Sequence, residues 1–322
     1  LKALAPDIMV TCAYGQILSQ EILDIPKYGV INVHGSLLPE YRGSSPLQWS
    51  LINGEKSTGV TIMRTDIGMD TGDMLRKVEF DIPDDMYIDE LFIKAANEGA
   101  KLLKETLPDY IAGKITPEKQ DESKATKCVM LKKEDALIDW TQPNYVIRNK
   151  IRGMGYGYTF YKGEMLKIFR LSLANGNGRP GEIVVENKTI KVYCGQSALT
   201  LEQLQLPNKK KLDCREFLNG TKMTSGLTNY ERQKFVYGLL CKVYFDKAYC
   251  GIVLNDGIGL APEGDRAFIT KVFYGVIEKD VYLNYALSAL VKQSPQPKVA
   301  LVMKIGLYQL YFTDQAPYAV VS

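Results

Sequence analysis

Short apolar runs and helix-period stretches alternate along the first third of the chain. Pro6–Ala13 and Tyr28–Val33 are compact and rich in β-branched residues, so they predict two buried strands. Gly59–Thr65 and Asp73–Phe80 predict two further strands. Pro46–Ile52, which begins with proline, predicts a short helix, and the alternation as a whole is typical of an α/β domain.

The periodicity changes after the long helix that Ile88–Ile111 predicts through apolar residues at spacings of three and four. Lys114–Lys133 is polar and has no period, so it predicts a linker. Four short runs with turn residues between them then predict a small β barrel or sandwich: Met165–Leu173, Gly181–Val185, Thr189–Cys194 and Ala198–Leu204. Four helix-period runs follow and predict an all-helical bundle: Tyr230–Tyr249, Gly264–Ile277, Asp280–Val291 and Val299–Phe312. We therefore expect a multidomain chain divided at residues 1–113, 114–223 and 224–322.

Composition places the chain among ordinary globular proteins. Hydrophobic residues make up 46% and charged residues 24% of the chain, which excludes wholesale disorder. No apolar run reaches the ~18–20 residues of a membrane-spanning helix, so we expect no membrane partner. The six cysteines are scattered without a C-x-x-C pair, which favours reduced thiols in a cytoplasmic protein over a zinc site.

Charge is distributed unevenly. Lys and Arg number 10 against 17 Asp and Glu in residues 1–113, but 20 against 12 in residues 114–223. The basic middle segment indicates either an anionic macromolecular partner or an ordinary solvated surface.

His34 is the only histidine in the chain, so any imidazole chemistry depends on it. Asn32 and His34 lie two residues apart on a predicted strand, and their side chains therefore share one face. The strand leads into Gly35–Pro39, at the carboxyl edge where open α/β sheets bind ligands. An amide and an imidazole on a buried strand need polar partners, which makes them site candidates, although a purely structural histidine is the common alternative.

The loop Asp66–Asp73 is a second candidate because it carries three aspartates between two predicted strands. It lacks the glutamate and the flanking helices of a calcium loop, so we predict no metal. The loop is either a plain Asx turn or the place where one aspartate pairs with His34.

The run NVHGSLLPEYRGSSPLQ, which ends at Gln48, and the later run GVTIMRTDIGMDTGDML resemble the formyltransferase family that uses 10-formyltetrahydrofolate. The closest resemblance is to the methionyl-tRNA formyltransferases, and it covers Ala5–Gly113. The family has an Asn-x-His at a strand end and a later Asp, which match Asn32, His34 and Asp70. The resemblance implies that Asn32 and a protonated His34 donate to the formyl oxygen while Asp70 holds the imidazole and orders a water. It also implies a folate pocket lined by Ser36, Leu37, Leu38 and Pro39.

The middle segment carries the second part of the resemblance. Asp121–Trp140 and Ile151–Gly153 resemble the family's carboxy-terminal domain, a small basic OB-like barrel that contacts initiator methionyl-tRNA. The implied partner is that tRNA, and the candidate phosphate contacts are Arg42, Arg148, Lys150, Arg152, Lys209, Lys210 and Lys211. A solvated loop arginine at Arg42 and a solvated lysine run at Lys209–Lys211 remain the alternatives.

Two departures from the family affect the expected function. The runs AFITKVFYGVIEK and ALVMKIGLYQLYFTDQAPYAVVS resemble a helical RNA-binding domain of the antitermination-factor type, which also opens a ribosomal-RNA cytosine-5 methyltransferase family. Ribosomal RNA is therefore a second implied partner. The strands that open the formyltransferase sheet are not in the sequence, so we expect residues 1–113 alone to be poorly soluble and residues 1–322 to lack measurable formylation. The alternatives to a formyltransferase are a non-catalytic RNA-binding chain and part of a fused methyltransferase.

Overall fold

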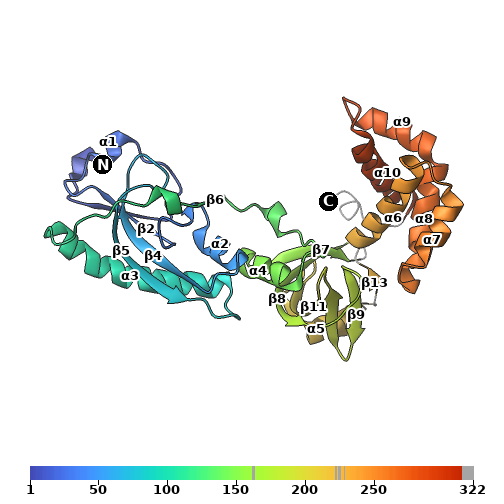
Figure 1. The fold of residues 1–322 in the computed structure, drawn as a ribbon, viewed down its shortest axis with the longest axis horizontal. Coiled ribbons are helices and arrows are strands. Elements are labelled where there is room, and N and C mark those ends of the chain that lie inside the picture. The colour runs from blue at the N-terminus through green and yellow to red at the C-terminus, as the bar shows by residue number, and fades with distance from the viewer. Residues whose placement is uncertain (162–163, 222, 224–225, 228, 314–322) are drawn as a thin grey trace. The chain divides into compact units, whose positions relative to one another are not determined.

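The computed structural model describes residues 1–161, 164–221, 223, 226–227 and 229–313 (Figure 1). The chain divides into two compact units, residues 1–136 with 149–156 and residues 137–148 with 157–322. The run that ends the sequence is described only to residue 313, and residue 224, the start of the predicted third domain, lies outside the described residues.

The first unit contains a four-stranded sheet, as the apolar runs predict. Its strands lie in the order β1 (Met9–Cys12), β2 (Val30–His34), β4 (Ser57–Arg64) and β5 (Met74–Asp81). β1 pairs with β2 in parallel, whereas β2 with β4 and β4 with β5 are antiparallel. Two short helical turns, η1 (Lys2–Leu4) and α1 (Gln20–Leu23), flank the edge strand β1 in the sequence.

Both predicted helices of this unit are confirmed with their predicted bounds, as α2 (Pro46–Ile52) and α3 (Ile88–Ile111). The backbone N–H of Tyr87 donates to Glu90 Oε2 at 2.8 Å, which caps the amino end of α3. The apolar face of α3, including Leu91, packs on β4 and β5 and closes the core (Figure 1). This layer holds the sheet rigid beneath the loops at its edge.

The prediction that Pro6–Ala13 is a buried strand is wrong. Only Met9–Cys12 forms the strand, its residues alternate between half-buried and exposed, and Val10 is 43% exposed. β1 lies at the edge of the described sheet, and α3 packs on the two strands at the opposite edge. An edge position therefore explains why an apolar run is not fully buried.

The predicted linker is a packed segment. Glu118 pairs with Met74, and β6 (Lys127–Cys128) pairs in parallel with β3 (Arg42–Gly43). Two helical turns belong to this stretch, η2 (Glu122–Lys124) and η3 (Lys133–Ala136). We call residues 118–128 the strap, because they run across the loops that follow β2 and β4.

The second unit contains an all-β sheet, which confirms the β-rich middle segment. The described strands form an open path in the order β13, β9, β10, β11, β8 and β7, with β12 beside β11. Their bounds are β7 (Gly157–Tyr161), β8 (Glu164–Ala174), β9 (Glu182–Glu186), β10 (Thr189–Tyr193), β11 (Ala198–Gln205), β12 (Leu212–Asp213) and β13 (Gly226–Leu227). The helices α4 (Asn144–Met154) and α5 (Cys214–Gly220) have no counterpart among the predicted elements.

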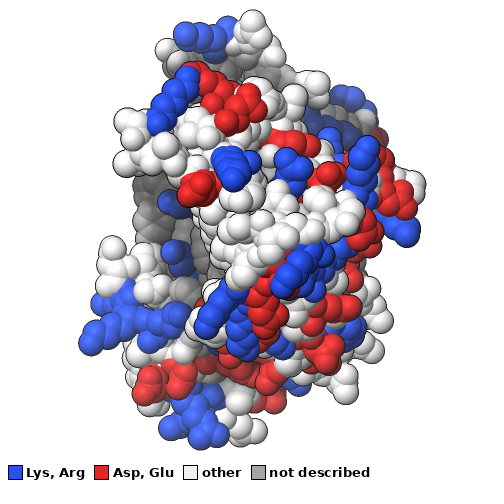
Figure 2. Space-filling view, turned by 90° about the vertical axis from the view of Figure 1, so that its left-hand side faces the viewer, with Lys and Arg blue, Asp and Glu red and all other residues white. Residues whose placement is uncertain are grey.

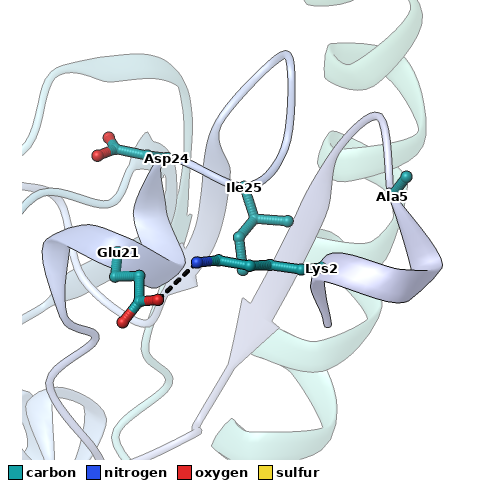
Figure 3. Close-up of a pocket in the computed structure, with 5 residues that line it drawn as sticks. All are labelled: Lys2, Ala5, Glu21, Asp24 and Ile25. Atoms are coloured by element: carbon teal, nitrogen blue, oxygen red, sulfur yellow. Dashed lines mark hydrogen bonds and ion pairs between the residues drawn. The ribbon is translucent and has the colours of Figure 1, made fainter.

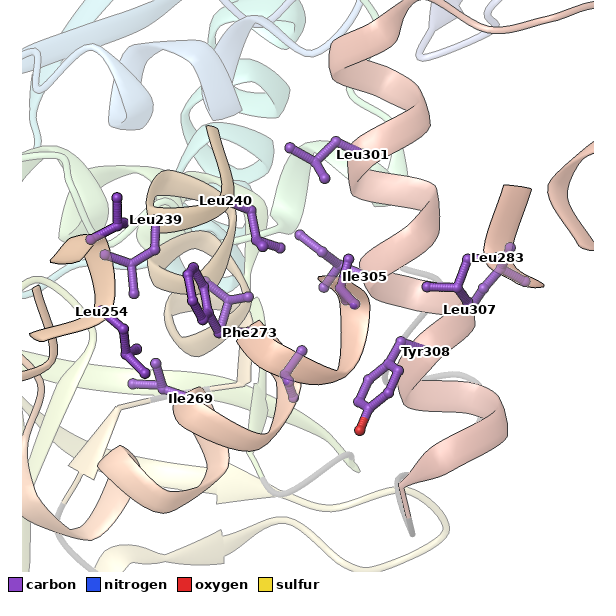
Figure 4. Close-up of a cluster of buried hydrophobic side chains, with 14 of the residues drawn as sticks. Leu239, Leu240, Leu254, Ile269, Phe273, Leu283, Leu301, Ile305, Leu307 and Tyr308 are labelled. Carbon is purple, nitrogen blue, oxygen red and sulfur yellow. The ribbon is translucent and has the colours of Figure 1, made fainter. Parts of the chain in front are cut away.

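A helical bundle completes the second unit. Its helices are α6 (Asn229–Tyr244), α7 (Cys250–Ile258), α8 (Glu263–Glu278), α9 (Asp280–Leu290) and α10 (Pro297–Phe312). The predicted first helix ends five residues early, because Lys247 has a left-handed φ of 59° before α7 begins. Leu240, Phe273, Leu283 and Ile305 point into one apolar core (Figure 4). None of the helices that the structure describes is long and apolar enough to cross a membrane.

Candidate active site

Strand β2 carries Asn32 and His34 to the carboxyl edge of the sheet. Thr11 on the neighbouring β1 donates its hydroxyl to Asn32 Oδ1 at 3.0 Å, so the amide group of Asn32 directs its Nδ2 away from β1. His34 is 6% exposed although it lies at the strand end. The strand therefore presents two fixed polar side chains on one face, as their spacing predicts.

Asp70 reaches these two side chains from the loop between β4 and β5. Its backbone has a left-handed φ of 54°, which aspartate tolerates better than most residues. The backbone N–H of Gly43 donates to Asp70 Oδ2 at 2.8 Å, and the side chain of Gln120 donates to Asp70 O at 2.8 Å. The loop is thus held by contacts from two other segments of the first unit.

The three residues converge on a single carboxylate oxygen. Asn32 Nδ2 lies 3.5 Å and His34 Nδ1 lies 3.6 Å from Asp70 Oδ1. Both separations exceed the usual 2.7–3.2 Å of an N–H···O hydrogen bond. Asn32 Nδ2, and His34 Nδ1 when both ring nitrogens carry protons, therefore keep capacity for a further oxygen atom placed between them. The structure brings together all three residues that the resemblance selects.

The other ring nitrogen of His34 is also engaged. His34 Nε2 lies 3.0 Å from the carbonyl oxygen of Tyr41, which can only accept, so Nε2 carries a proton. With Nε2 fixed in this way, Nδ1 is the ring nitrogen that faces Asp70. Cys128 lies beside the same carbonyl, and burial raises the pKa of its thiol to about 11, so the thiol stays neutral near pH 7.

The loop Ser36–Pro39 is held mainly by its own backbone. Ser36 O accepts a hydrogen bond from Thr61 Oγ1 at 2.7 Å, and Leu38 O accepts one from Lys77 Nζ at 2.6 Å. Ser36 and Leu38 are buried, whereas Leu37 and Pro39 are half-buried. An open pocket of about 470 Å³ is lined by Leu37, Leu38, Pro39, Glu40, Lys77, Glu79 and Lys124, but by none of the three convergent residues.

A second hollow of about 400 Å³ lies near the start of the chain. Figure 3 shows Lys2 and Glu21 joined across it by an ion pair, 2.6 Å between Lys2 Nζ and Glu21 Oε1. Both side chains are highly exposed, and the polar groups there bond to each other. This hollow contributes nothing to the site at the end of β2.

Two of the predicted RNA contacts, Arg42 and Arg152, have buried guanidinium groups that bond within the protein. Arg42 is 3% exposed and forms two hydrogen bonds with the Glu122 carboxylate, at 3.0 and 2.8 Å. The Arg42 guanidinium holds the pKa of Glu122 below its usual range. Arg152 is 4% exposed and donates to the backbone oxygens of Met86 and Pro83. Both arginines stabilise the first unit, and Arg42 is not a solvated loop arginine.

The remaining basic candidates differ in exposure. Arg148 and Lys150 on α4 are half-buried, whereas Lys209, Lys210 and Lys211 are exposed. Lys211 Nζ lies 4.0 Å from the centre of the Phe169 ring, a cation–π contact. Figure 2 shows basic and acidic side chains intermixed over one face of the molecule. By exposure, the lysine run is the most accessible part of the predicted RNA surface.

The described residues contain no group of three His, Cys, Asp or Glu side chains that could hold a metal ion. In the loop of three aspartates, Asp66 accepts hydrogen bonds from the backbone N–H of Gly68 and from Thr71 Oγ1. Asp66 thus forms an Asx turn, which is one of the two alternatives that the sequence leaves open. Asp70 corresponds to the other alternative, because it faces His34.

Several residues around the site escape sequence reasoning. Tyr41 contributes a carbonyl oxygen and Gly43 an N–H, and backbone groups carry no residue-specific signal. A side chain at Gly43, whose φ is +106°, would also collide with the carbonyl of Cys128. Gln120 lies in a stretch without periodicity, so nothing in its neighbourhood marks it.

Comparisons with known proteins agree with this geometry. The formyl transferase profile matches residues 1–107, the profile of the formyl transferase C-terminal domain matches residues 130–222, and the NusB family profile matches residues 231–322. The methionyl-tRNA formyltransferase of Citrifermentans bemidjiense is 46% identical over 70% of this chain and 72% of its own length. That of Clostridium novyi is 45% identical over 68% of this chain and 73% of its own. The chain belongs to the methionyl-tRNA formyltransferase family.

Solved structures support the fold of this methionyl-tRNA formyltransferase family member. HypX from Aquifex aeolicus, solved with tetrahydrofolic acid, has a TM-score of 0.53 at 18% identity and covers 66% of this chain and 38% of its own. WlaRD, a sugar 3N-formyl transferase solved with dTDP and 5-N-formyl-THF, has a TM-score of 0.51 at 20% identity over 65% and 77% of the two chains. The helical NusB-like region confirms the second resemblance that the sequence carries.

Proposed function

We propose that this protein transfers the formyl group of 10-formyltetrahydrofolate to the amino group of methionyl-initiator-tRNA. The observation that carries the proposal is the convergence of Asn32, His34 and Asp70, with both donors 3.5–3.6 Å from one carboxylate oxygen. A histidine with a purely structural role would be expected to bond Asp70 at an ordinary hydrogen-bond distance, not at 3.6 Å. Family membership gives the reaction class, and the geometry supports Asn32, His34 and Asp70 as the residues that carry it.

Asn32 and His34 act on the oxygen at which negative charge develops when the amine attacks the formyl carbon. Thr11 holds the amide of Asn32, and the Tyr41 carbonyl holds the ring of His34. Asn32 Nδ2 donates as it stands, and His34 Nδ1 donates in the protonated ring. Donors that are already oriented stabilise a developing oxyanion without reorganising during the reaction. The bound folate supplies the formyl group, which places the formyl oxygen between these two donors.

Asp70 holds the imidazole and orders a water that carries a proton from the attacking amine to the folate nitrogen, which leaves as its bond to the formyl carbon breaks. Its Oδ2 accepts from Gly43 N–H at 2.8 Å, which leaves Oδ1 to face Asn32 and His34. A carboxylate with one oxygen fixed and one open is suited to moving a proton by general base catalysis. Ser36, Leu37, Leu38 and Pro39 are the proposed folate-lining residues, and Leu37 and Pro39 are the accessible ones.

RNA is the proposed macromolecular partner. Lys209–Lys211 and the half-buried Arg148 and Lys150 are the proposed phosphate contacts to initiator tRNA, supported by the excess of basic residues in 114–223. The NusB family match supports ribosomal RNA as a partner of residues 224–322. We also propose the domain bounds 1–113, 114–223 and 224–322 and a cytoplasmic location.

The test is formation of formylmethionyl-tRNA by the protein expressed from its natural reading frame. We expect formylation that requires both 10-formyltetrahydrofolate and methionyl-tRNA. Tight RNA binding with no formylation under any folate condition would contradict the proposal and support the non-catalytic RNA-binding alternative. Methyl transfer to ribosomal RNA would support the remaining alternative.

A further inference from the structure

The strap contacts the groups around His34 from two directions. Toward Asp70, the Gln120 side chain donates from Nε2 to Asp70 O and to Gly72 O, both at 2.8 Å. Toward Tyr41, the Thr126 hydroxyl accepts the backbone N–H of Tyr41 at 2.8 Å. Asp70 and Tyr41 are the residues that face the two ring nitrogens of His34. One segment therefore holds both neighbours of the imidazole.

Gln120 is itself held in a fixed orientation. Its Oε1 accepts from Arg42 Nε at 2.9 Å, and Arg42 is buried in its double hydrogen bond with Glu122. Because Oε1 faces a group that can only donate, Nε2 is the atom that faces the two carbonyl oxygens. The amide thus has one possible arrangement, in which Nε2 donates to the carbonyl oxygens of the Asp70 loop.

The two hydrogen bonds from Gln120 matter because the Asp70 backbone is in the left-handed region, at φ 54°. Such a conformation persists only where the surrounding structure over-determines it. Gln120 bonds the carbonyls on both sides of Thr71, and Gly43 bonds the carboxylate. These contacts set where Asp70 Oδ1 lies relative to Asn32 and His34.

We propose that Gln120 is a positioning residue that acts through Asp70, and that the strap is part of the catalytic apparatus. The inference rests on the proposed function for its effect on turnover, but its effect on His34 is independent of that function. Displacement of a reacting group by about 1 Å can lower a rate about a hundredfold.

Two substitutions separate the donor end of Gln120 from its acceptor end. Gln120→Met removes both, whereas Gln120→Glu keeps the acceptor for Arg42 and loses the donor to the carbonyls. We expect both to lower kcat by ~10–100-fold with KM for each substrate nearly unchanged. Gln20→Met and Gln20→Glu are matched controls, because Gln20 donates only to the exposed Asp24, and we expect them to change kcat by less than about twofold. Full turnover in Gln120→Glu would overturn the proposal.

A double-mutant cycle distinguishes positioning from general destabilisation. If Gln120 acts through Asp70, Gln120→Met has almost no further effect on kcat once Asp70→Asn is present. Multiplying effects in the double variant would show instead that Gln120 acts independently of Asp70.

A second readout needs no activity. His34 is the only histidine in the chain, so an untagged 322-residue protein labelled with ¹⁵N in its imidazole gives the two ring-nitrogen signals of a single residue. We expect Gln120→Met to shift the Nδ1 signal and Gln20→Met to leave it unchanged. Identical spectra for Gln120→Met and the unmodified protein would overturn the proposal. A shifted signal, together with no formyl transfer by the protein expressed from its natural reading frame, would support the positioning role and contradict only the proposed function.

Discussion

Two aspartates, Asp70 in the first unit and Asp280 in the second, meet their partners in opposite ways. Asp280 accepts hydrogen bonds from Tyr244 OH at 2.6 Å, from Lys304 Nζ at 2.8 Å and from Asn284 Nδ2 at 2.9 Å. Asp70 Oδ1 faces its two donors at 3.5 and 3.6 Å. The first cluster is saturated at ordinary bonding distances, and the second is loose.

The difference separates stabilising polar groups from reactive ones. Burial raises the pKa of Asp280, but the bonds from Lys304 and Tyr244 outweigh this and leave its pKa below the ordinary value. A saturated carboxylate adds to the stability of the bundle and has no free position for a substrate atom. Asp70, whose neighbours lie beyond ordinary hydrogen-bond distance of Oδ1, still has room beside that oxygen for a substrate atom.

The largest expected effect follows from removing members of the loose cluster. Asn32→Ala and Asp70→Ala should each lower the turnover of formyl transfer by ~10²–10⁴-fold, because each removes a donor or acceptor aimed at the reacting atoms. Steady-state kinetics together with the melting temperature provide the check. A loss of folding in place of a loss of turnover would place Asp70 in the same class as Asp280.

The opposite result is expected in the tight cluster. Asp280→Ala leaves the Lys304 ammonium, which is buried, without its carboxylate and should destabilise the bundle by about 1–3 kcal/mol. Hydrogen exchange in α9 and α10 measures the change, and formyl transfer at low temperature should be unaffected. Unchanged exchange rates would contradict a stabilising role for Asp280.

The exposed lysine run offers a comparison with the buried arginines. Changing Lys209, Lys210 and Lys211 together to Glu should weaken tRNA binding and lower the slope of log affinity against log salt by ~0.7–0.9 for each phosphate that the protein no longer neutralises. The replacement Lys188→Glu, at a turn of the same sheet, is a control for the position of the change, with one third of the change in charge. Binding that depends neither on salt nor on the three lysines would show that the run is an ordinary solvated surface.

The smallest effect concerns pH and a buried carboxylate on α6, Glu231. Burial raises the pKa of Glu231 from 4.5 to about 7, with Lys234 opposing and Asp139 adding to the shift. Because the folded state binds the proton more tightly, its stabilising contribution is complete below the unfolded pKa and is lost as pH rises toward 7. The free energy of unfolding should fall by at most about 1.4 kcal/mol per pH unit in that range.

The check is urea unfolding of the bundle over roughly pH 5 to 8, the range in which protein stability usually peaks. Glu231→Gln should flatten this part of the profile, while Glu263→Gln, at an exposed position on α8, should leave it as it is. A profile that keeps its slope in Glu231→Gln would assign the pH dependence to other groups.

Local patterns predicted the parts of the fold that depend on neighbours in sequence. α2 and α3 have their predicted bounds because proline at the first turn and a helical apolar face are local signals. Asn32 and His34 share a face because a strand alternates its side chains, and the resemblance selected Asp70. These predictions needed no knowledge of distant contacts.

Predictions that depend on tertiary contacts were less successful. Arg42 is buried because Glu122, 80 residues later, returns to pair with it, and Arg152 is buried by backbone oxygens of a distant loop. The strap carries no periodic signal, since it is stabilised by polar contacts to loops and not by a continuous apolar face. A contact made by a backbone group, such as the Tyr41 carbonyl beside His34, cannot be predicted from residue types, because every residue has that group.

The most direct test of the account is the single-turnover rate of His34→Ala in the protein expressed from its natural reading frame, with both substrates saturating. We expect the rate of formyl transfer to fall by ~10²–10⁴-fold while the affinity for methionyl-tRNA is retained, since the imidazole acts on the reacting oxygen and not on the RNA. A His34→Ala protein that transfers the formyl group at nearly the original rate would contradict the assignment of the loose cluster as the catalytic centre.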